Sequence, residues 1–518
     1  MQSNALARRG APAKRLGVAA CAAASVIAGT ARAETLADAI VAAYETNPTI
    51  QAQRSDQQIT DEGYIQARAG WRPTIALQAS AGYSQAPQTD PFFGTQQVTA
   101  NTDSVALTLQ QPLYTGGRTL AAVRAARADI MAGREQLRST EASVLAQVVT
   151  AYESVLYDTK IISVRREDLS AFESQVAESQ ARLKAGDATK TDVAQSQAQL
   201  ASAEELLAQA NAQLQADRAL YTTVVGDPPG TLDEIGVLPG LPPTVDEAFD
   251  LAENNNPDLA RAVEAEQASS ARIAEARAAR RPSVALQASA GYGGPIVPFE
   301  PSGYFSSTTV QVVVTQPIYD GGQINSGVRV ALAQNTIDRV SIEATRREVV
   351  QTVAQSWNAW LTASANIDTT RAGLAAAQVA FKGSQIEYRS GLRSTTDVLL
   401  AEQALSNANV AVAQAQRDEI LAEAALLAVT GRLEAKALVT GLRAYDPSTS
   451  FNRRERAAEL PGERLLELGD HVGAPTSANR SGPPSPPPPT SAPTLRPATQ
   501  TPPSGPLITT WPGSTTER

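Results

Sequence analysis

Apolar residues in this chain recur at two different spacings, one typical of strands and one typical of helices. The same order of strand-like and helix-like segments occurs twice. Apolar residues recur at every second position over residues 74–84 and 104–113, which predicts two strands of about ten residues each. The same period returns over 283–293 and 307–318. Elsewhere the apolar residues recur at the spacing of a helix. The pattern therefore predicts two pairs of strands embedded in a largely helical chain.

The predicted helices surround each pair of strands in the same order, one before the pair and two after it. Proline-free stretches rich in Ala, Gln, Glu, Leu and Arg, which are good helix formers, follow both pairs. At about 1.5 Å per residue, the longest helices would reach roughly 100 Å and the shorter ones roughly 55 Å. The expected helices span about 35–70, 118–183, 188–225, 244–280, 323–388 and 393–430.

The two halves also share sequence. The heptapeptide LQASAGY occurs at Leu77–Tyr83 and again at Leu286–Tyr292. A repeat of about 200 residues is too long for a solenoid unit and indicates a duplicated, domain-sized module. The offset between matching residues falls from 209 to 205 between Tyr83 and Gln111, which predicts a loop that tolerates changes in length. The expected units are a first repeat at 34–226, a proline-rich linker at 227–243 and a second repeat at 244–435.

Both ends of the chain differ in composition from the repeats. Basic residues, a small-residue apolar run and an Ala-x-Ala cleavage motif predict a signal peptide over 1–33. The alternative is a lipoprotein signal that ends at Cys21, but the apolar run continues past this residue. Thirteen prolines within 475–512, with Ser, Thr and Gly between them, predict a disordered tail over 436–518.

The residue inventory excludes several classes of function. The formal net charge is −9, and loss of the five positive charges in the signal would leave −14, which disfavours nucleic acid as a partner. Cys21 and His471 are the only cysteine and histidine, so thiolate metal sites and His-based triads are excluded. Catalytic motifs such as a phosphate-binding loop do not stand out. We therefore expect no enzyme activity, no cofactor and no metal.

The strand pairs bear on whether the chain enters a membrane. After the signal, no apolar run approaches the roughly 18 residues that a membrane-spanning helix needs. Strands of about ten residues with alternating faces match those of membrane barrels in length and pattern. A soluble hairpin has the same alternation and is the alternative interpretation. Four strands are too few to close a barrel, so the membrane interpretation requires an oligomer, and a trimer would supply twelve strands.

The order of these elements, together with several short motifs, resembles the TolC-like outer-membrane efflux proteins over residues 36–435. The motifs are Glu34-Thr35-Leu36-x-x-Ala39, Tyr44, Asn47-Pro48, Arg72-Pro73, the paired Gln-Pro-Leu/Ile-Tyr-x-Gly-Gly segments and the Thr-Asp-Val reversals at Thr191 and Thr396. The resemblance implies a mainly α fold with membrane β structure. Each chain would hold two copies of a module made of a helix, a β-hairpin and a long helical hairpin.

The resemblance also implies an assembly and partners. A homotrimer would form a twelve-stranded β-barrel in the outer membrane, in contact with its lipid, continuous with a twelve-helix tunnel in the periplasm. The implied function is a passive exit duct for drug efflux or type I protein secretion. An inner-membrane RND or ABC transporter would supply energy, and a periplasmic adaptor, or membrane fusion protein, would join the two.

The helix reversals are the natural place to close such a duct. Asp397 follows the second reversal, and in a trimer it would form a ring of three carboxylates if it points inward, with pKa values raised by crowding. The alternative is that Asp397 stabilises the first turn of a helix, as its counterpart Asp192 would do in the first repeat. The resemblance implies a second acidic residue one turn later, where this chain has Leu400.

The resemblance further implies residues that hold the duct closed. Tyr388 and Arg393 would bind Thr191 and Asp192 and so connect the two hairpins; the alternative is that they are ordinary turn residues. The reversal tips, marked by Gly186 and Gly391, would receive the periplasmic adaptor.

Two other functions remain open from the residues alone. A non-transporting coiled coil that spans the periplasm would need no membrane sheet and would conduct no ions. A periplasmic adaptor carries one helical hairpin, and the duplicated hairpin argues against it.

Overall fold

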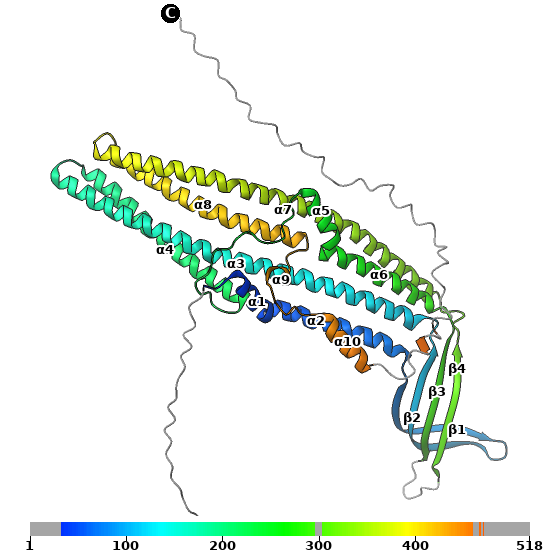
Figure 1. Ribbon diagram of the computed structural model, residues 1–518. Helices are drawn as coiled ribbons and strands as arrows, with labels where there is room; N and C mark the ends of the chain where they lie inside the picture. Colours follow the sequence, from blue (N-terminus) through cyan, green and yellow to red (C-terminus); the bar gives the residue numbers. More distant parts are fainter. Residues whose placement is uncertain (1–32, 296–302, 459–465, 468–469, 471–518) are drawn as a thin grey trace, which may run out of the picture.

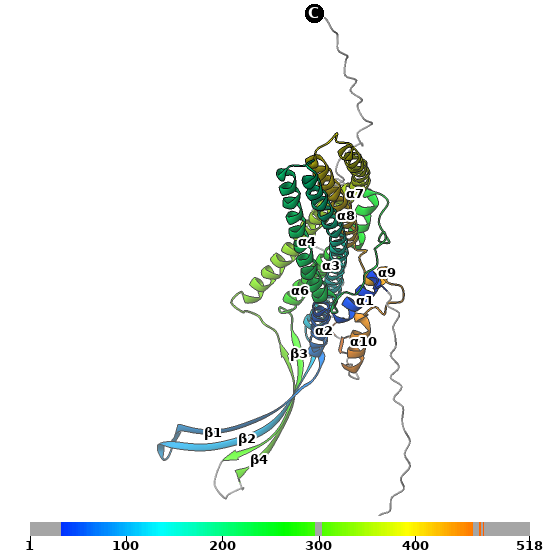
Figure 2. The same ribbon diagram turned by 90° about the vertical axis from the view of Figure 1, so that its left-hand side faces the viewer.

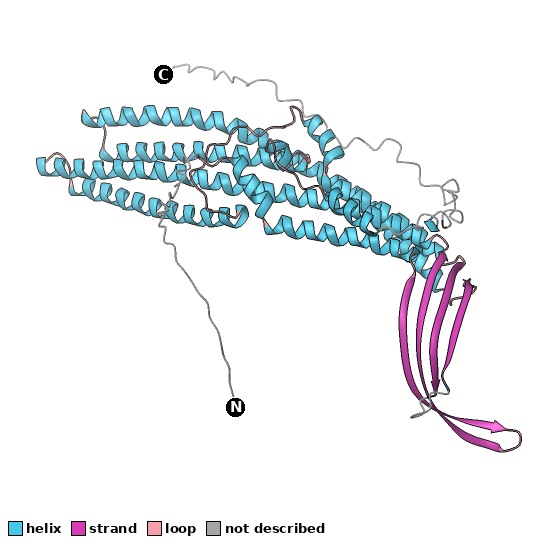
Figure 3. Ribbon diagram, turned by 60° about the horizontal axis from the view of Figure 1, so that its bottom comes forward, coloured by secondary structure: helices cyan, strands magenta, loops and turns pink. Residues whose placement is uncertain are grey.

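The computed structural model describes residues 33–295, 303–458, 466–467 and 470 (Figure 1). The expected signal peptide over 1–33, apart from its last residue, lies outside this range, as do the alternative at Cys21 and most of the expected tail. The described chain is an elongated helical bundle with one small sheet at one end (Figures 1 and 3).

Two long helical hairpins dominate the bundle, one from each repeat. The first pairs α3 with α4, and the second pairs α7 with α8. α3 and α7 run from the sheet to the far end of the molecule, where both hairpins reverse (Figure 3). The bounds are Arg118–Ala185 for α3, Lys190–Val225 for α4, Gln323–Arg389 for α7 and Thr395–Val429 for α8.

The leading helix of each repeat is broken at an Asn-Pro pair. Asn47 caps the second half by accepting the N–H of Thr49 at 2.9 Å, and Asn256 accepts the N–H of Asp258 at 3.0 Å. Proline fits the first turn of a helix, where its missing N–H has no intrahelical partner. The two expected helices are therefore four: α1 Leu36–Thr46, α2 Pro48–Arg68, α5 Val245–Asn255 and α6 Pro257–Ala278, with a short 3-10 turn, η1, at Ala69–Trp71.

The same asparagines fix these breaks to the hairpins. The side-chain amide of Asn47 donates to the carbonyl of Val224 at 2.9 Å, and that of Asn256 donates to Val429 at 2.9 Å. Each acceptor lies in the last turn of α4 or α8, where carbonyls lack helical partners. The shorter helices thus stack end to end beside the long ones.

The four strands form one antiparallel sheet in the order β1-β2-β3-β4. Apolar side chains are aligned across it, because Leu77 pairs with Leu107, Leu109 with Ala288, and Ala288 with Val310. Residues that face each other across a ladder share one face of a sheet. The strand bounds are β1 Thr74–Asp90, β2 Gly94–Tyr114, β3 Ser283–Pro295 and β4 Phe305–Thr315.

Two strand expectations need correction. The tolerant loop expected between Tyr83 and Gln111 is mostly strand, because β1 and β2 stay paired as far as Asp90 and Gly94. We call residues 84–101, where β1 and β2 pair only with each other among the described residues, the ribbon; the ribbon curves away from the rest of the sheet (Figure 2). The strand expected over 307–318 ends at Thr315. Pro317 follows closely, and proline has no N–H to donate to a ladder.

The largest buried core lies midway along the bundle, where α1, α3 and α4 meet the linker. Tyr152 is fully buried, and its hydroxyl lies 2.7 Å from the carbonyl oxygen of Glu34 and 2.8 Å from that of Asp233. Leu238 of the linker is buried in the same core, and Glu34 pairs with Leu232. The linker is therefore packed against both repeats.

The expected tail does not begin at residue 436. α9 at Ala435–Leu438 spans that point, and α10 at Pro447–Ala458 lies beyond it. Phe451 of α10 packs edge-on against Tyr64 of α2, with 5.2 Å between ring centroids. The sequence of α10 has no strong apolar period that would predict a helix. Its aromatic and charged side chains nevertheless bind α2. Separately, none of the helices within the described ranges is long and apolar enough to cross a membrane.

Candidate functional site

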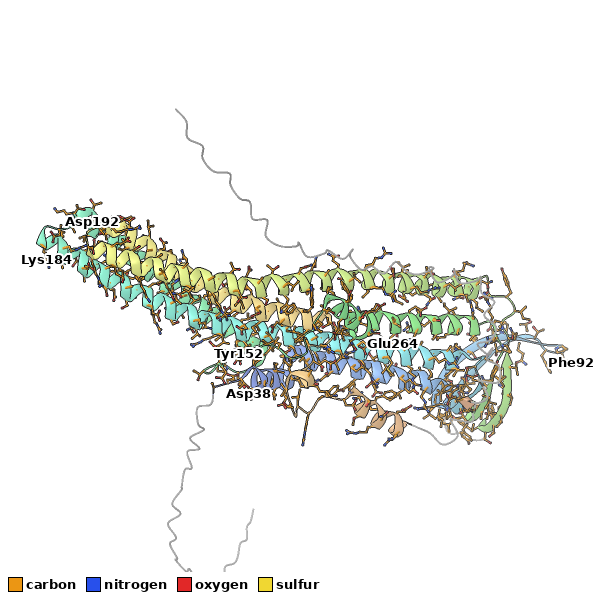
Figure 4. All side chains as sticks on the ribbon, turned by 45° about the horizontal axis from the view of Figure 1, so that its top comes forward. Asp38, Phe92, Tyr152, Lys184, Asp192 and Glu264 are labelled. Atoms are coloured by element: carbon orange, nitrogen blue, oxygen red, sulfur yellow. The ribbon has the colours of Figure 1, made fainter. Side chains whose placement is uncertain are left out.

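Both helix reversals lie at the same end of the molecule, opposite the sheet. Lys184 and Asp192 stand at one extreme, and Phe92 of the β1–β2 turn stands at the other (Figure 4). The two hairpins lie side by side up to their ends (Figure 1). The candidate site therefore combines residues from both repeats.

The first reversal is built from a glycine and a capping box. Gly186 ends α3 with φ of 87°, a left-handed conformation that costs a residue with a Cβ atom more than glycine. Thr189 then begins α4: its hydroxyl accepts the N–H of Asp192 at 3.2 Å, and the Asp192 carboxylate accepts the N–H of Thr189 at 2.8 Å. This reciprocal pair satisfies two helix N–H groups that have no other partner.

The second reversal repeats this design. Gly391 has φ of 75° and follows the end of α7. Ser394 begins α8: its hydroxyl accepts the N–H of Asp397 at 3.3 Å, and the Asp397 carboxylate accepts the N–H of Ser394 at 3.0 Å. Gly186 and Gly391 thus mark the tips as expected from their positions in sequence.

The two aspartates have similar capping environments within one chain. The backbone N–H of Thr189 lowers the pKa of Asp192, and the backbone N–H of Ser394 lowers the pKa of Asp397, on which the charge of Arg393 also acts. Both residues therefore stabilise the start of a helix, which was the alternative interpretation. A ring of Asp397 carboxylates concerns three chains and stays a prediction.

Tyr388 joins the hairpins, but through a residue that the sequence did not indicate. Its ring is buried, and the guanidinium of Arg182 from α3 lies 4.3 Å from the ring centroid. Its hydroxyl accepts the hydroxyl of Thr395 at 3.4 Å. The contact expected with Thr191 and Asp192 is replaced, within this chain, by the contact with Arg182.

Arg393 also differs from expectation. Within the described residues its ion-pair partner is Glu387, with 2.7 Å between nitrogen and oxygen, and both belong to the second hairpin. Six positions separate these residues across the turn, so little chain entropy opposes their contact. Arg393 therefore braces its own reversal here rather than binding Asp192 of the other hairpin.

Further contacts between the hairpins lie near the tips, and no sequence pattern indicated them. The hydroxyl of Thr396 donates to the side-chain oxygen of Gln195 at 3.1 Å. Phe172 of α3, Ala203 of α4 and Leu399 of α8 form a small buried cluster. Polar and apolar contacts thus alternate along the seam between the hairpins.

A buried polar network crosses the same seam further from the tips. Arg165 of α3 pairs with Asp168 at 3.2 Å and donates to the hydroxyl of Ser406 on α8 at 2.8 Å. Glu402 is buried one turn before Ser406. Its burial, with a smaller contribution from the charge of Asp168, raises the pKa of Glu402 to about 7. A protonatable carboxyl therefore lies between the hairpins.

Leu400 is more than half exposed in the single chain, as is Leu392 at the tip of the second reversal. Apolar side chains in these places are available to another chain or to the interior of a duct. Within the described ranges, no three His, Cys, Asp or Glu side chains gather closely enough to hold a metal ion.

Comparisons with known proteins agree with this architecture. The family described as outer membrane efflux protein matches residues 39–226 and 248–432, one match for each repeat. The outer membrane efflux protein BepC of Brucella suis is 31% identical over 436 residues, which cover 83% of this chain and 94% of that protein. Outer membrane protein TolC of Escherichia coli is 23% identical over 460 residues, covering 85% and 90%.

A solved structure has the same fold. The outer membrane protein VceC of Vibrio cholerae superposes with a TM-score of 0.65 at 20% identity, over 76% of this chain and 96% of that chain. Together with the family match and the similarity to BepC, this confirms the resemblance to TolC-like proteins. The family match to both repeats and the similarity to BepC show that this chain is an outer-membrane protein belonging to the outer membrane efflux protein family.

Proposed function

We propose that three copies of this chain form a passive exit duct through the outer membrane. The duct is coupled through a periplasmic adaptor to an inner-membrane RND or ABC transporter. Membership of the outer membrane efflux protein family supports this function, and BepC, a relative over most of both chains, is itself named an efflux protein. Efflux of small molecules is the main candidate, and type I protein secretion is the second substrate class.

The distribution of side chains on the sheet carries the proposal. One face is apolar across all four strands, and its larger side chains are exposed in the single chain: Ile75, Leu77, Val105, Leu107, Tyr292, Val310, Val312 and Val314. The opposite face holds small and polar groups, among them Ser80 and Ser104, whose hydroxyls lie 2.8 Å apart. A sheet with one lipid-compatible face and one polar face suits the wall of an aqueous pore.

The edges of the sheet support assembly of several copies. β1 and β4 are the outer strands of the sheet, so each has one side without a strand partner in the described chain. An exposed edge beside a wide apolar face favours pairing with another chain. Three copies joined edge to edge would supply twelve strands in a closed ring, in contact with outer-membrane lipid.

The helical hairpins supply the periplasmic part of the duct. α3 has 68 residues, which corresponds to roughly 100 Å from the sheet to the reversals. The tips at Gly186 and Gly391 are then farthest from the membrane, where an adaptor can reach them. The contacts between the hairpins, including Arg182 with Tyr388, hold this end closed until the partners bind.

Single-channel recording tests the proposal directly. The purified protein should run as a trimer by native mass measurement and should conduct ions in planar bilayers. We expect a small current in the closed state, because the tips restrict the pore. A folded trimer that never conducts, alone or with adaptor and transporter added, would instead support the alternative of a non-transporting periplasmic coiled coil. Accumulation of dyes and secretion of proteins by cells that lack the chain would separate the two substrate classes.

A further inference from the structure

The two places where the sheet joins the helices have the same backbone design. In the first repeat, the side-chain amide of Gln111 donates to the carbonyl of Trp71 at 2.8 Å. In the second, Gln316 donates to the carbonyl of Arg280 at 2.9 Å. Each glutamine also donates to the carbonyl of the proline that follows it. The two junctions are therefore equivalent in their glutamine hydrogen bonds, so a difference elsewhere between them points to a role specific to one repeat.

The second junction contains its own carboxylate. Asp320, in the turn before α7, accepts the N–H of Gly322 at 3.0 Å and the N–H of Ile324. These donors lower the pKa of Asp320, with help from the charge of Arg280. The first N–H groups of a helix lack internal partners, so a carboxylate here stabilises the start of α7.

The first junction has threonine at the matching position. Thr115 corresponds to Asp320, and Thr119 corresponds to Ile324. The Thr115 hydroxyl accepts the N–H of Thr119 at 3.1 Å and so replaces one of the two bonds that Asp320 makes. A neutral hydroxyl supplies no negative charge, so the start of α3 lacks the electrostatic part of the interaction.

A carboxylate reaches this junction from the distant C-terminal part of the chain. Asp470 is fully buried, and its carboxylate accepts the N–H of Thr115 at 2.8 Å and the hydroxyl of Thr115 at 2.6 Å. It also accepts the indole N–H of Trp71 at 3.0 Å. Trp71 occupies the position of Arg280, whose charge acts on Asp320 in the second junction while its guanidinium donates to Asn325 at 2.6 Å. Three donors compensate for the burial of the charge.

α10 packs against the part of α2 that leads to this junction. The carboxylate of Glu455 accepts the hydroxyl of Tyr64 at 3.1 Å and pairs with Arg68 at 3.3 Å, in the last two turns of α2 before Trp71. Arg454 donates to the side chain of Gln58 at 2.8 Å. These contacts place α10 along α2, on the side of the bundle near the first junction.

We propose that the first junction is a carboxylate-binding site, formed by Trp71 and Thr115, whose ligand is Asp470 of the same chain. We call α10 together with Asp470 the C-terminal strap. The strap provides the carboxylate of the first junction, whereas the second junction has its own carboxylate in Asp320. The two repeats thus keep one junction design with two sources of negative charge. This inference concerns the folded chain and holds whether or not the chain conducts.

Hydrogen exchange of the full-length protein tests the site. Asp470→Ala removes the ligand, so the amides of Thr115 and Thr119 should exchange faster by about tenfold or more, since hydrogen bonds to charged groups are the stronger ones. Asp446→Ala is the matched control, because Asp446 is another C-terminal carboxylate, which accepts the N–H of Ser448 at 2.8 Å at the start of α10. An equal rise in this control, or no rise in Asp470→Ala, would overturn the proposal.

A rescue variant separates the ligand role from general damage. Thr115→Asp copies Asp320 into the first junction, so adding it to Asp470→Ala should return exchange at Thr119 toward the native rate. Thr115→Asp alone places two carboxylates at one site and should raise exchange in α10. If Asp470→Ala fails to fold, recovery of folding in the double variant supports the proposal. Failure of the double variant as well would contradict it, because the missing charge has been restored.

Discussion

The guanidinium of Arg182 lies 4.3 Å from the ring centroid of Tyr388. Arg182 belongs to the last turn of α3 and Tyr388 to the last turn of α7, so the contact joins the two hairpins immediately before they reverse. Tyr388 is buried, which keeps its ring in place beneath the cation. Separation of the hairpin ends would have to break this contact.

Replacing Arg182 should favour the open duct. A cation–π contact at an exposed site is worth about 0.5–1 kcal/mol, and a trimer contains three of them. We expect Arg182→Gln to increase the open fraction in planar bilayers several-fold, while Arg182→Lys, which keeps a cation, has a smaller effect. Arg393→Ser is the comparison variant, because Arg393 pairs with Glu387 inside one hairpin. A larger increase from Arg393→Ser than from Arg182→Gln would show that Arg393 makes the decisive contact between chains.

The two capping aspartates should differ in transport although they have the same local role. Asp192→Ala and Asp397→Ala each remove a capping box, so both should weaken the start of a helix. Because these carboxylates have lowered pKa values, their stabilisation is present at neutral pH and is lost as the pH falls below their ordinary value. Only Asp397→Ala should also weaken block of the current by divalent cations, if Asp397 forms the ring. Equal block in both variants would exclude the ring.

Glu402 should make the seam between the hairpins sensitive to pH. The pKa of this buried carboxyl is about 7 in the folded chain, against an ordinary value of 4.5. Between these values the folded state holds a proton that the unfolded chain releases, so the free energy of unfolding falls as the pH rises. We expect a loss of about 1–2 kcal/mol between pH 4.5 and 7.5, after a discount for solvent screening.

Glu402→Gln provides the check, because glutamine does not titrate. Thermal unfolding of the variant across the same pH range should show a smaller decline than the native protein. The introduced amide has nearly the same size as the carboxyl and still fits beside Ser406, so the fold should be retained. An identical decline in both proteins would assign the pH dependence to other groups, such as the buried carboxyl of Glu153.

Neighbouring residues of β1 test which face of the sheet meets lipid. Leu77 lies on the apolar face and Gln78 on the polar face, and both are exposed in the single chain. Leu77→Lys should destabilise the membrane-inserted protein, by about 2–4 kcal/mol if this position lies at the middle of the bilayer and by about 0–1 kcal/mol if it lies near an interface. Gln78→Lys should assemble normally. The amount of folded trimer in outer-membrane fractions measures both, and equal yields would contradict the proposed orientation.

The sequence predicted the elements whose apolar side chains recur at a regular spacing. The paired strands and the long helices follow from apolar periods of two residues and of a helical turn, since each period reports one buried or lipid-facing side. The leading helices were expected as single helices over 35–70 and 244–280, and the prolines that follow Asn47 and Asn256 explain why each is broken in two. The ribbon was missed because it has no core to cover, so its side chains carry no strong alternation.

Contacts between residues far apart in the sequence could not be predicted, because no pattern near either residue indicates its partner. Thr115 and Asp470 are 355 positions apart, and nothing near either residue identifies the other. Similarly, Arg182 has no feature that sets it apart from other basic residues of α3. The resemblance implied that Tyr388 and Arg393 bind Thr191 and Asp192, whereas within this chain Tyr388 contacts Arg182 and Arg393 pairs with Glu387.

The ribbon has a consequence for how a cell bearing this protein meets its surroundings. Within the described residues, the β2–β3 ladder extends to Thr102, whereas the β1–β2 ladder continues to the turn at Phe92 and Phe93, both largely exposed. With the hairpins in the periplasm, the ribbon projects outward from the cell. Its length can drift without disturbing the wall of the pore, as the four-residue offset between the repeats already suggests. The ribbon is therefore where antibodies and phages would find this protein, and where a displayed peptide would be carried to the outside.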